Sequence, residues 1–152
     1  MSKKKVNKET KAYKEKQVRK VRNRCLKLWK ECVKLRAGNK CEATGTTEQL
    51  NCHHIEDYKM HSYLRYSVNN GICLSPGSHK FSAAAAHKSF LFMLKMQEKF
   101  PERFAALKEE AEHIELHKVM PVQDLSYFEM IEQGLLNIKS RLLGVAIDTV
   151  NI

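Results

Sequence analysis

The sequence of 152 residues predicts a mostly helical α+β protein built around one small β-hairpin. Three observations lead to this prediction. Apolar residues recur at helical spacing towards both ends of the chain. Between residues 40 and 80 the sequence instead has short apolar runs separated by turn residues. Apolar residues make up 43% of the chain and charged residues 29%, which is typical of a soluble globular domain.

The first predicted helix carries an apolar stripe and ends at a glycine. Trp29 lies beside this stripe and is expected in the core, while Gly38-Asn39 supplies a stop signal. The stripe covers too few heptads for a coiled coil, so we expect the helix to pack on its own domain. The members of the stripe are three or four residues apart: Val18, Val21, Cys25, Leu28, Cys32 and Leu35.

Two strands and three further helices complete the predicted fold. The strands are expected at Leu50–Ile55 and Gly71–Leu74, next to turn residues. Ser82 is expected to cap a helix that continues to about residue 99, Pro101 to begin the next, and Asp124 to cap the last. The inner side of the first of these helices is expected to carry Phe90, Met93 and Leu94.

Positive charge is concentrated at the N-terminus. Residues 1–40 hold 16 Lys or Arg against 3 Glu, a net charge of +13, whereas the remainder holds 11 against 14 acids, a net −3. Such a concentration favours binding to a polyanion, although a solvated helix face has a similar composition. The predicted nucleic-acid contacts in this basic arm are Lys16, Arg19, Lys20, Arg22 and Arg24.

The same composition speaks against membrane and secreted classes. No apolar run approaches the roughly 18 residues that a membrane span needs, and no apolar segment follows the N-terminal lysines as in a signal peptide. Five cysteines are an odd number without the paired spacing of a secreted scaffold. We therefore expect reduced thiols and a cytoplasmic location.

Two histidine motifs, Cys52-His53-His54-Ile55 and Ser78-His79-Lys80, flank an asparagine motif, Asn69-Asn70-Gly71. Adjacent residues of a strand point to opposite faces, so His53 and His54 can serve different roles a few ångströms apart. A neutral imidazole can bind a metal ion or accept a proton from water near neutral pH.

In these motifs the chain resembles the HNH endonuclease family (ββα-metal nucleases), in particular its small phage and prophage members. The resemblance covers roughly residues 36–100 and includes Leu64-Arg65-Tyr66 before the Asn-Gly pair. It implies a ββα-metal hairpin–helix core flanked by the basic helix and the C-terminal helices. It also implies a phage- or prophage-encoded enzyme acting on DNA in a bacterial host.

The resemblance assigns a role to each motif residue. It implies that His54 is the general base, that His53 and His79 bind the metal ion, and that Asn70 holds the loop and orients His54 by hydrogen bonding. Arg65 and Lys80 are further candidate DNA contacts, although Arg65 is equally consistent with a structural ion pair. The implied reaction is hydrolysis of a DNA phosphodiester with one divalent ion, Mg²⁺ or Mn²⁺ first and Zn²⁺ or Ni²⁺ as alternatives.

The sequence departs from the family pattern in two places. Many members hold a structural zinc ion with four cysteines, but the matching positions here are Cys41, Thr44, Ser75 and Ser78, so we expect no structural zinc. The usual third-ligand position is Ala83. His87 is the substitute, and it reaches the ion only if residues 80–82 form a loop, because eight residues of continuous helix rise about 12 Å; otherwise it is an ordinary helix-surface histidine.

These observations divide the chain into a basic arm at 1–37, a nuclease core at 38–100 and a helical extension at 101–152. The leading hypothesis is a metal-dependent DNA endonuclease that nicks or cuts both strands. The alternative is a non-catalytic, metal-stabilised nucleic-acid-binding module. A monomer and a homodimer both remain open.

Overall fold

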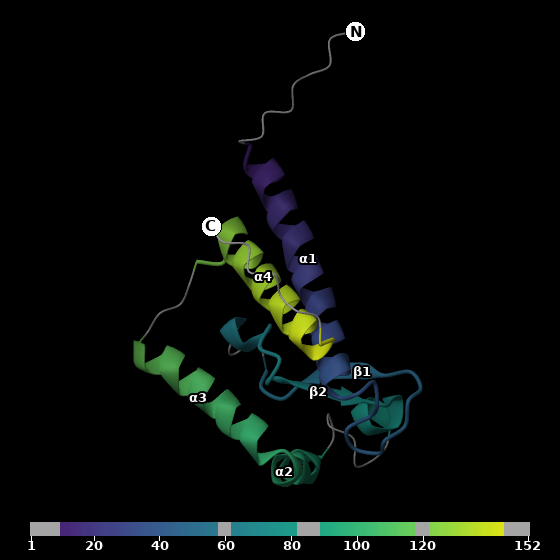
Figure 1. Ribbon diagram of the computed structural model, residues 1–152. Helices are drawn as coiled ribbons and strands as arrows, with labels where there is room; N and C mark the ends of the chain where they lie inside the picture. The colour runs from purple at the N-terminus through teal and green to yellow at the C-terminus, as the bar shows by residue number, and fades with distance from the viewer. Residues whose placement is uncertain (1–9, 58–61, 82–88, 118–121, 145–152) are drawn as a thin grey trace.

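The computed structural model describes residues 10–57, 62–81, 89–117 and 122–144 (Figure 1). These residues form a mostly helical α+β structure with one two-stranded antiparallel sheet, as the sequence predicts. The elements in chain order are α1 (Lys11–Arg36), β1 (Asn51–His54), the 3-10 turn η1 (Ser62–Leu64), β2 (Gly71–Leu74), the π-helical turn η2 (Gly77–Phe81), α2 (Phe90–Lys99), α3 (Pro101–His117) and α4 (Leu125–Leu142).

Helix α1 is longer than its apolar stripe. It begins seven residues before Val18, where the hydroxyl of Thr10 accepts a hydrogen bond from the Tyr13 N–H. It ends at Arg36, as the stop signal predicts, because Gly38 and Asn39 adopt left-handed backbone angles with φ of 62° and 53°.

Helices α1 and α4 run parallel and share one core. The Cys25 thiol donates to the Phe128 carbonyl at 3.2 Å, and the Cys32 thiol donates to the Leu135 carbonyl at 3.4 Å. Because both pairs are separated by 103 residues, the two helices advance in the same direction. Trp29 is 1% exposed in this core, which confirms its predicted burial.

The hairpin separates two apolar clusters. In its register His53 lies opposite Ile72 and His54 opposite Gly71. Cys73 belongs to the cluster formed with α1 and α4. Ile72 and Leu74 belong to a second cluster with side chains of α2. The described residues of the predicted segments 1–37 and 101–152 therefore do not form separate units, since α1, β2 and α4 contribute to the same core.

Helix α2 differs from its prediction. Ser89 has extended backbone angles, φ −131° and ψ 113°, and its side chain caps a helix that begins at Phe90. A continuous helix from Ser82 to residue 99 is therefore wrong; Ser82 itself lies outside the described residues. The buried face also differs from the expected one: Phe92 and Met96 pack with Ile72 and Leu74, while Phe90 is 76% exposed and Leu94 is 38% exposed.

The last two helices begin where the sequence predicts. Pro101 is the first residue of α3. The carboxylate of Asp124 accepts the Tyr127 N–H at 3.0 Å and caps α4. None of the described helices is both long enough and apolar enough to cross a membrane.

Candidate functional site

His54 is the last residue of β1, and its side chain faces α1. Its ring stacks on Trp29 with 4.1 Å between the ring centroids and 4° between the ring planes. Its Nε2 lies 2.9 Å from the carbonyl oxygen of Arg65. Because a carbonyl oxygen only accepts, Nε2 of the neutral ring carries the proton and Nδ1 carries the lone pair. The surroundings thus select the tautomer that leaves Nδ1 as the basic nitrogen.

The environment also favours the neutral form of His54. Burial lowers the pKa of its imidazole below the ordinary histidine value, while the hydrogen bond to the Arg65 carbonyl partly opposes this shift. The imidazole is only part-buried, so solvent reaches this residue. A neutral, partly exposed imidazole with a fixed tautomer is chemically suited to accept a proton from water.

Asn70 holds the loop that supports His54. It is fully buried, and its side-chain carbonyl accepts the Glu56 N–H at 2.7 Å. Its amide donates to the carbonyl oxygens of Glu56 at 3.1 Å and Leu64 at 3.0 Å. Leu64 precedes Arg65, whose carbonyl receives the His54 bond. The expected bond from Asn70 to the imidazole is therefore replaced by an indirect arrangement, and Asn70 is a positioning residue rather than a catalytic one.

His53 lies on the other face of the strand, together with His79. Their ring centroids are 5.2 Å apart with 69° between the planes. His79 is held in η2, where its N–H donates to the Ser75 carbonyl at 2.9 Å. The opposite placement of His53 and His54 confirms the strand argument, because His54 contacts α1 while His53 contacts η2.

The His53–His79 pair fits two ligands of one metal ion. Two imidazoles that bind an ion through bonds of about 2.1 Å at a tetrahedral angle have ring centroids about 5 Å apart. Within the described ranges no group of three or more His, Cys, Asp or Glu gathers around a possible ion. The expected third ligand, His87, lies outside those ranges. The described part of the site thus brings two imidazoles to a separation compatible with one ion, and metal binding by them stays a prediction.

Two residues missed as site components also position the loop. Trp29 was expected only in the core, yet its indole N–H donates to the Ser67 carbonyl at 2.7 Å while its ring supports His54. Arg36 donates to the carbonyls of Val68 and Gly71. The sequence signal for Trp29 was its position four residues from both Cys25 and Val33 on the buried helix face. Nothing local in the sequence indicates the role of Arg36.

The four positions that match the zinc-binding cysteines of the HNH family lie close together: Cys41, Thr44, Ser75 and Ser78. The Cys41 sulfur lies 3.7 Å from the Ser78 hydroxyl, and the Ser75 and Ser78 hydroxyls are 3.3 Å apart. Burial raises the pKa of the Cys41 thiol, but hydrogen bonds from Thr44 and Ser75 outweigh it and bring the pKa to about 6. One sulfur among hydroxyls is a poor zinc ligand set compared with four thiolates. The expectation of no structural zinc stays a prediction.

Glu42 joins the hairpin to three helices. Its carboxylate accepts the Cys73 N–H at 2.8 Å and an Arg103 N–H at 2.6 Å, and it lies 3.6 Å from Arg36. Its backbone carbonyl accepts a bond from Lys99 at 2.7 Å. This carboxylate therefore links β2, α1 and α3, and the backbone carbonyl adds α2.

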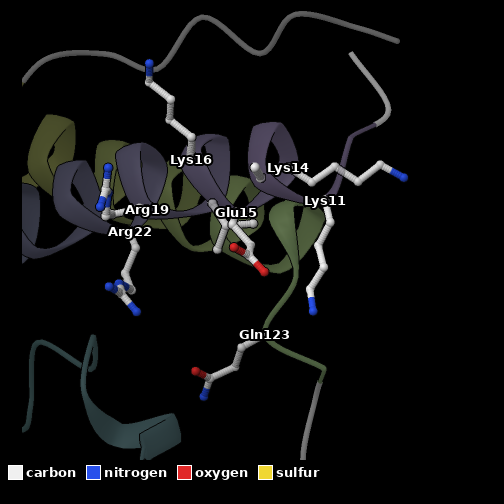
Figure 2. A pocket seen from close by; sticks show the side chains of 9 residues that line it. Lys11, Lys14, Glu15, Lys16, Arg19, Arg22 and Gln123 are labelled. Atoms are coloured by element: carbon white, nitrogen blue, oxygen red, sulfur yellow. The ribbon is translucent and has the colours of Figure 1, made fainter. Parts of the chain in front are cut away.

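The predicted nucleic-acid contacts separate into groups. Lys16, Arg19 and Arg22 line a hollow beside the start of α1, as Figure 2 shows. Lys20 is exposed on the same helix. Arg24 instead makes a two-pronged ion pair with Glu132 of α4, at 2.5 and 3.0 Å, which holds it against the protein. Arg24 as a nucleic-acid contact stays a prediction.

The other two candidate contacts lie near the hairpin. Arg65 is part-buried, and its guanidinium lies 5.8 Å from the centre of the Tyr66 ring. Its backbone carbonyl hydrogen-bonds to His54, and, after burial, its positive charge is among the causes that lower the pKa of the His54 imidazole. The side chain of Lys80 lies outside the described part of the chain.

Comparisons with protein-family models, curated proteins and solved structures found no match for this chain.

Proposed function

We propose that this protein is a metal-dependent DNA endonuclease of the HNH type. One observation carries the proposal: a neutral imidazole with a fixed tautomer, His54, is next in sequence to one member of a histidine pair on the opposite face of the strand. A water-activating base next in sequence to a member of a metal-binding pair brings together the two parts that phosphodiester hydrolysis needs. The basic surface of α1 supports DNA as the polyanion.

In the proposed reaction Nδ1 of His54 accepts a proton from a water molecule. The resulting hydroxide oxygen bonds to phosphorus, the bond between phosphorus and the 3′ oxygen breaks, and solvent protonates the leaving oxygen. Trp29 and the Arg65 carbonyl hold the imidazole throughout. A divalent ion bound by His53 and His79 would stabilise the negative charge that develops on the phosphate.

Single substitutions separate the two proposed roles. His54→Ala is expected to abolish cleavage of supercoiled plasmid while leaving Mn²⁺ binding, measured by calorimetry, unchanged. His53→Ala is expected to lose both cleavage and Mn²⁺ binding. His113→Ala, on the exposed side of α3, serves as the matched control and should behave as wild type. Full cleavage by a folded His54→Ala protein would contradict the assignment.

The basic helix also favours a second candidate, a nucleic-acid-binding module without catalysis. In that case His53 and His79 would hold a metal ion for stability alone. Wild type would then bind DNA and leave it intact with Mg²⁺, Mn²⁺, Ni²⁺ or Zn²⁺, and removal of metal by EDTA would lower its melting temperature.

A further inference from the structure

Helix α1 continues beyond the structure that it packs against. Because Cys25 lies beside Phe128 and Cys32 beside Leu135, the first residue of α4, Leu125, is level with Arg22. The eleven residues of α1 before that level extend about 16 Å past the start of α4. Figure 1 shows α1 continuing beyond the start of α4. Val21 is buried in the core shared with α4 and Val18 packs against it, so this packing accounts for α1 only from Val18 onward and not for residues 11–17.

The extending end carries positive charge on both sides of its axis. Figure 2 shows Lys16 on one side of the helix and Lys11 and Arg22 on the other. Glu15 is the one acid among the residues that line the hollow there. The cationic residues from the start of α1 to Arg22, all exposed, are Lys11, Lys14, Lys16, Arg19, Lys20 and Arg22.

A helix of this kind matches the major groove of duplex DNA. The groove is about 12 Å wide and admits one α-helix, and its two walls are the phosphate backbones of opposite strands. Cations on both sides of the helix would therefore face phosphates of both strands. We propose that residues 11–22 of α1 bind the major groove of duplex DNA next to the cleavage site. This inference rests on the proposed function, which makes DNA the substrate.

The same helix fixes the distance between this contact and the histidines. Trp29 of α1 stacks on His54, and Arg22 precedes Trp29 by seven residues, about 10 Å along the axis. Lys11 lies 18 residues before Trp29, about 27 Å away. The groove contact thus falls within about one helical turn of the duplex, roughly 34 Å, from the bond that is cut.

Modification interference tests which groove is occupied. Dimethyl sulfate methylates guanine N7, which lies in the major groove, and adenine N3, which lies in the minor groove. Binding is measured in EDTA, so that cleavage does not enter the result. We expect bound complexes to be depleted of DNA methylated at guanine N7 over part of one helical turn. Interference confined to adenine N3, or absent, would overturn the proposal.

A matched pair of double variants tests which residues make the contact. Arg19→Gln/Arg22→Gln should weaken duplex binding about tenfold at 0.1 M salt and reduce the slope of log affinity against log salt by about 2. Lys95→Gln/Lys108→Gln removes the same charge from exposed positions on α2 and α3 and should change neither. Equal effects from both variants would show that only total charge matters and would overturn the proposal.

The outcomes separate this inference from the proposed nuclease function. Guanine N7 interference without cleavage would overturn the nuclease function and keep the groove contact. Cleavage without guanine N7 interference would keep the nuclease function and overturn the groove contact. Failure to bind duplex DNA at any salt concentration would overturn both.

Discussion

At the scale of single residues, the site depends on how the neighbours of His54 fix its proton. The Arg65 carbonyl holds Nε2–H, the Trp29 ring holds the plane of the imidazole, and burial disfavours its charged form. Residue identity alone indicates only that a histidine is present. Its proposed use as a base rests on these tertiary contacts.

The lowered pKa of His54 predicts the acid side of the pH profile. Only the neutral ring accepts a proton, so kcat/KM for plasmid cleavage should fall as the pH drops through the pKa of the folded protein. That midpoint should lie below the ordinary histidine value of about 6.5. Folding also favours the neutral ring, because the pKa of His54 is lower in the folded protein than in the unfolded chain. The stability that the neutral His54 contributes is therefore fully present above the ordinary histidine pKa and is lost as the pH falls through the lowered pKa of the folded protein. An acid limb centred above pH 7 would contradict the buried neutral base.

Substitution of Asn70 should destabilise the protein more than substitution of its neighbour Asn69. Asn70→Ala leaves the Glu56 N–H and the carbonyls of Glu56 and Leu64 without their side-chain partner, and each buried unsatisfied group costs about 1–3 kcal/mol. We expect urea unfolding to show a loss of about 3 kcal/mol. Asn69→Ala removes one hydrogen bond, to Glu110, and should cost about 1 kcal/mol. Equal losses for the two variants would argue against the proposed positioning role.

At the scale of elements, α1 reaches the hairpin because Gly71 has no side chain. A Cβ at this position would lie 2.3 Å from one methyl carbon of Val33 and 3.0 Å from Trp29. Gly71 is also the partner of His54 across the strands. The close approach of α1 and the stacking of Trp29 on His54 therefore depend on the same glycine.

Substitution of Gly71 should displace α1 from the site. Gly71→Ala is expected to lower the free energy of unfolding by about 1–3 kcal/mol through overpacking and to reduce cleavage. Gly134→Ala, in α4 with no atom within 4 Å of the added methyl, should instead stabilise by about 0.5–1 kcal/mol. Val33→Ala combined with Gly71→Ala should recover part of the loss. A Gly71→Ala protein as stable and active as wild type would contradict this packing.

The elements themselves were largely predictable from local signals. Pro101 and Asp124 begin and cap their helices as expected, and β2 matches its predicted bounds. Ser89 was missed because an alanine-rich stretch before it favours helix, whereas its extended backbone restarts the helix at Phe90. The sequence motif also indicated the histidines, but not the Trp29 stack, which joins residues 25 positions apart in the chain.

At the scale of the whole molecule, Glu42 connects parts that are distant in sequence. Its carboxylate bonds to β2 and to Arg103 of α3 and lies near Arg36 of α1. Burial lowers the pKa of Arg36 to about 10, with repulsion from Arg103 as the next cause. A single acid between two buried arginines is a contact that periodicity does not reveal, because its partners lie 6 and 61 residues away.

Loss of this carboxylate should destabilise the entire fold. Glu42→Gln keeps the shape but leaves two buried guanidinium groups without a counter-charge, so we expect a loss of about 3–5 kcal/mol in the free energy of unfolding. Glu112→Gln removes an exposed pair with Lys108 and should change stability by about 0.5 kcal/mol or less. Thermal unfolding of both variants at matched pH measures the difference. Similar melting temperatures would show that Glu42 does not join these elements.

The most direct test of the nuclease account is the conversion of supercoiled plasmid by the wild-type protein with Mg²⁺ or Mn²⁺ and with EDTA. His54→Ala is assayed beside it at DNA concentrations where both proteins are fully bound. We predict nicked or linear product with metal, none with EDTA, and none from His54→Ala. Bound but intact DNA from the wild type with either metal, or cleavage that persists without His54, would contradict the account.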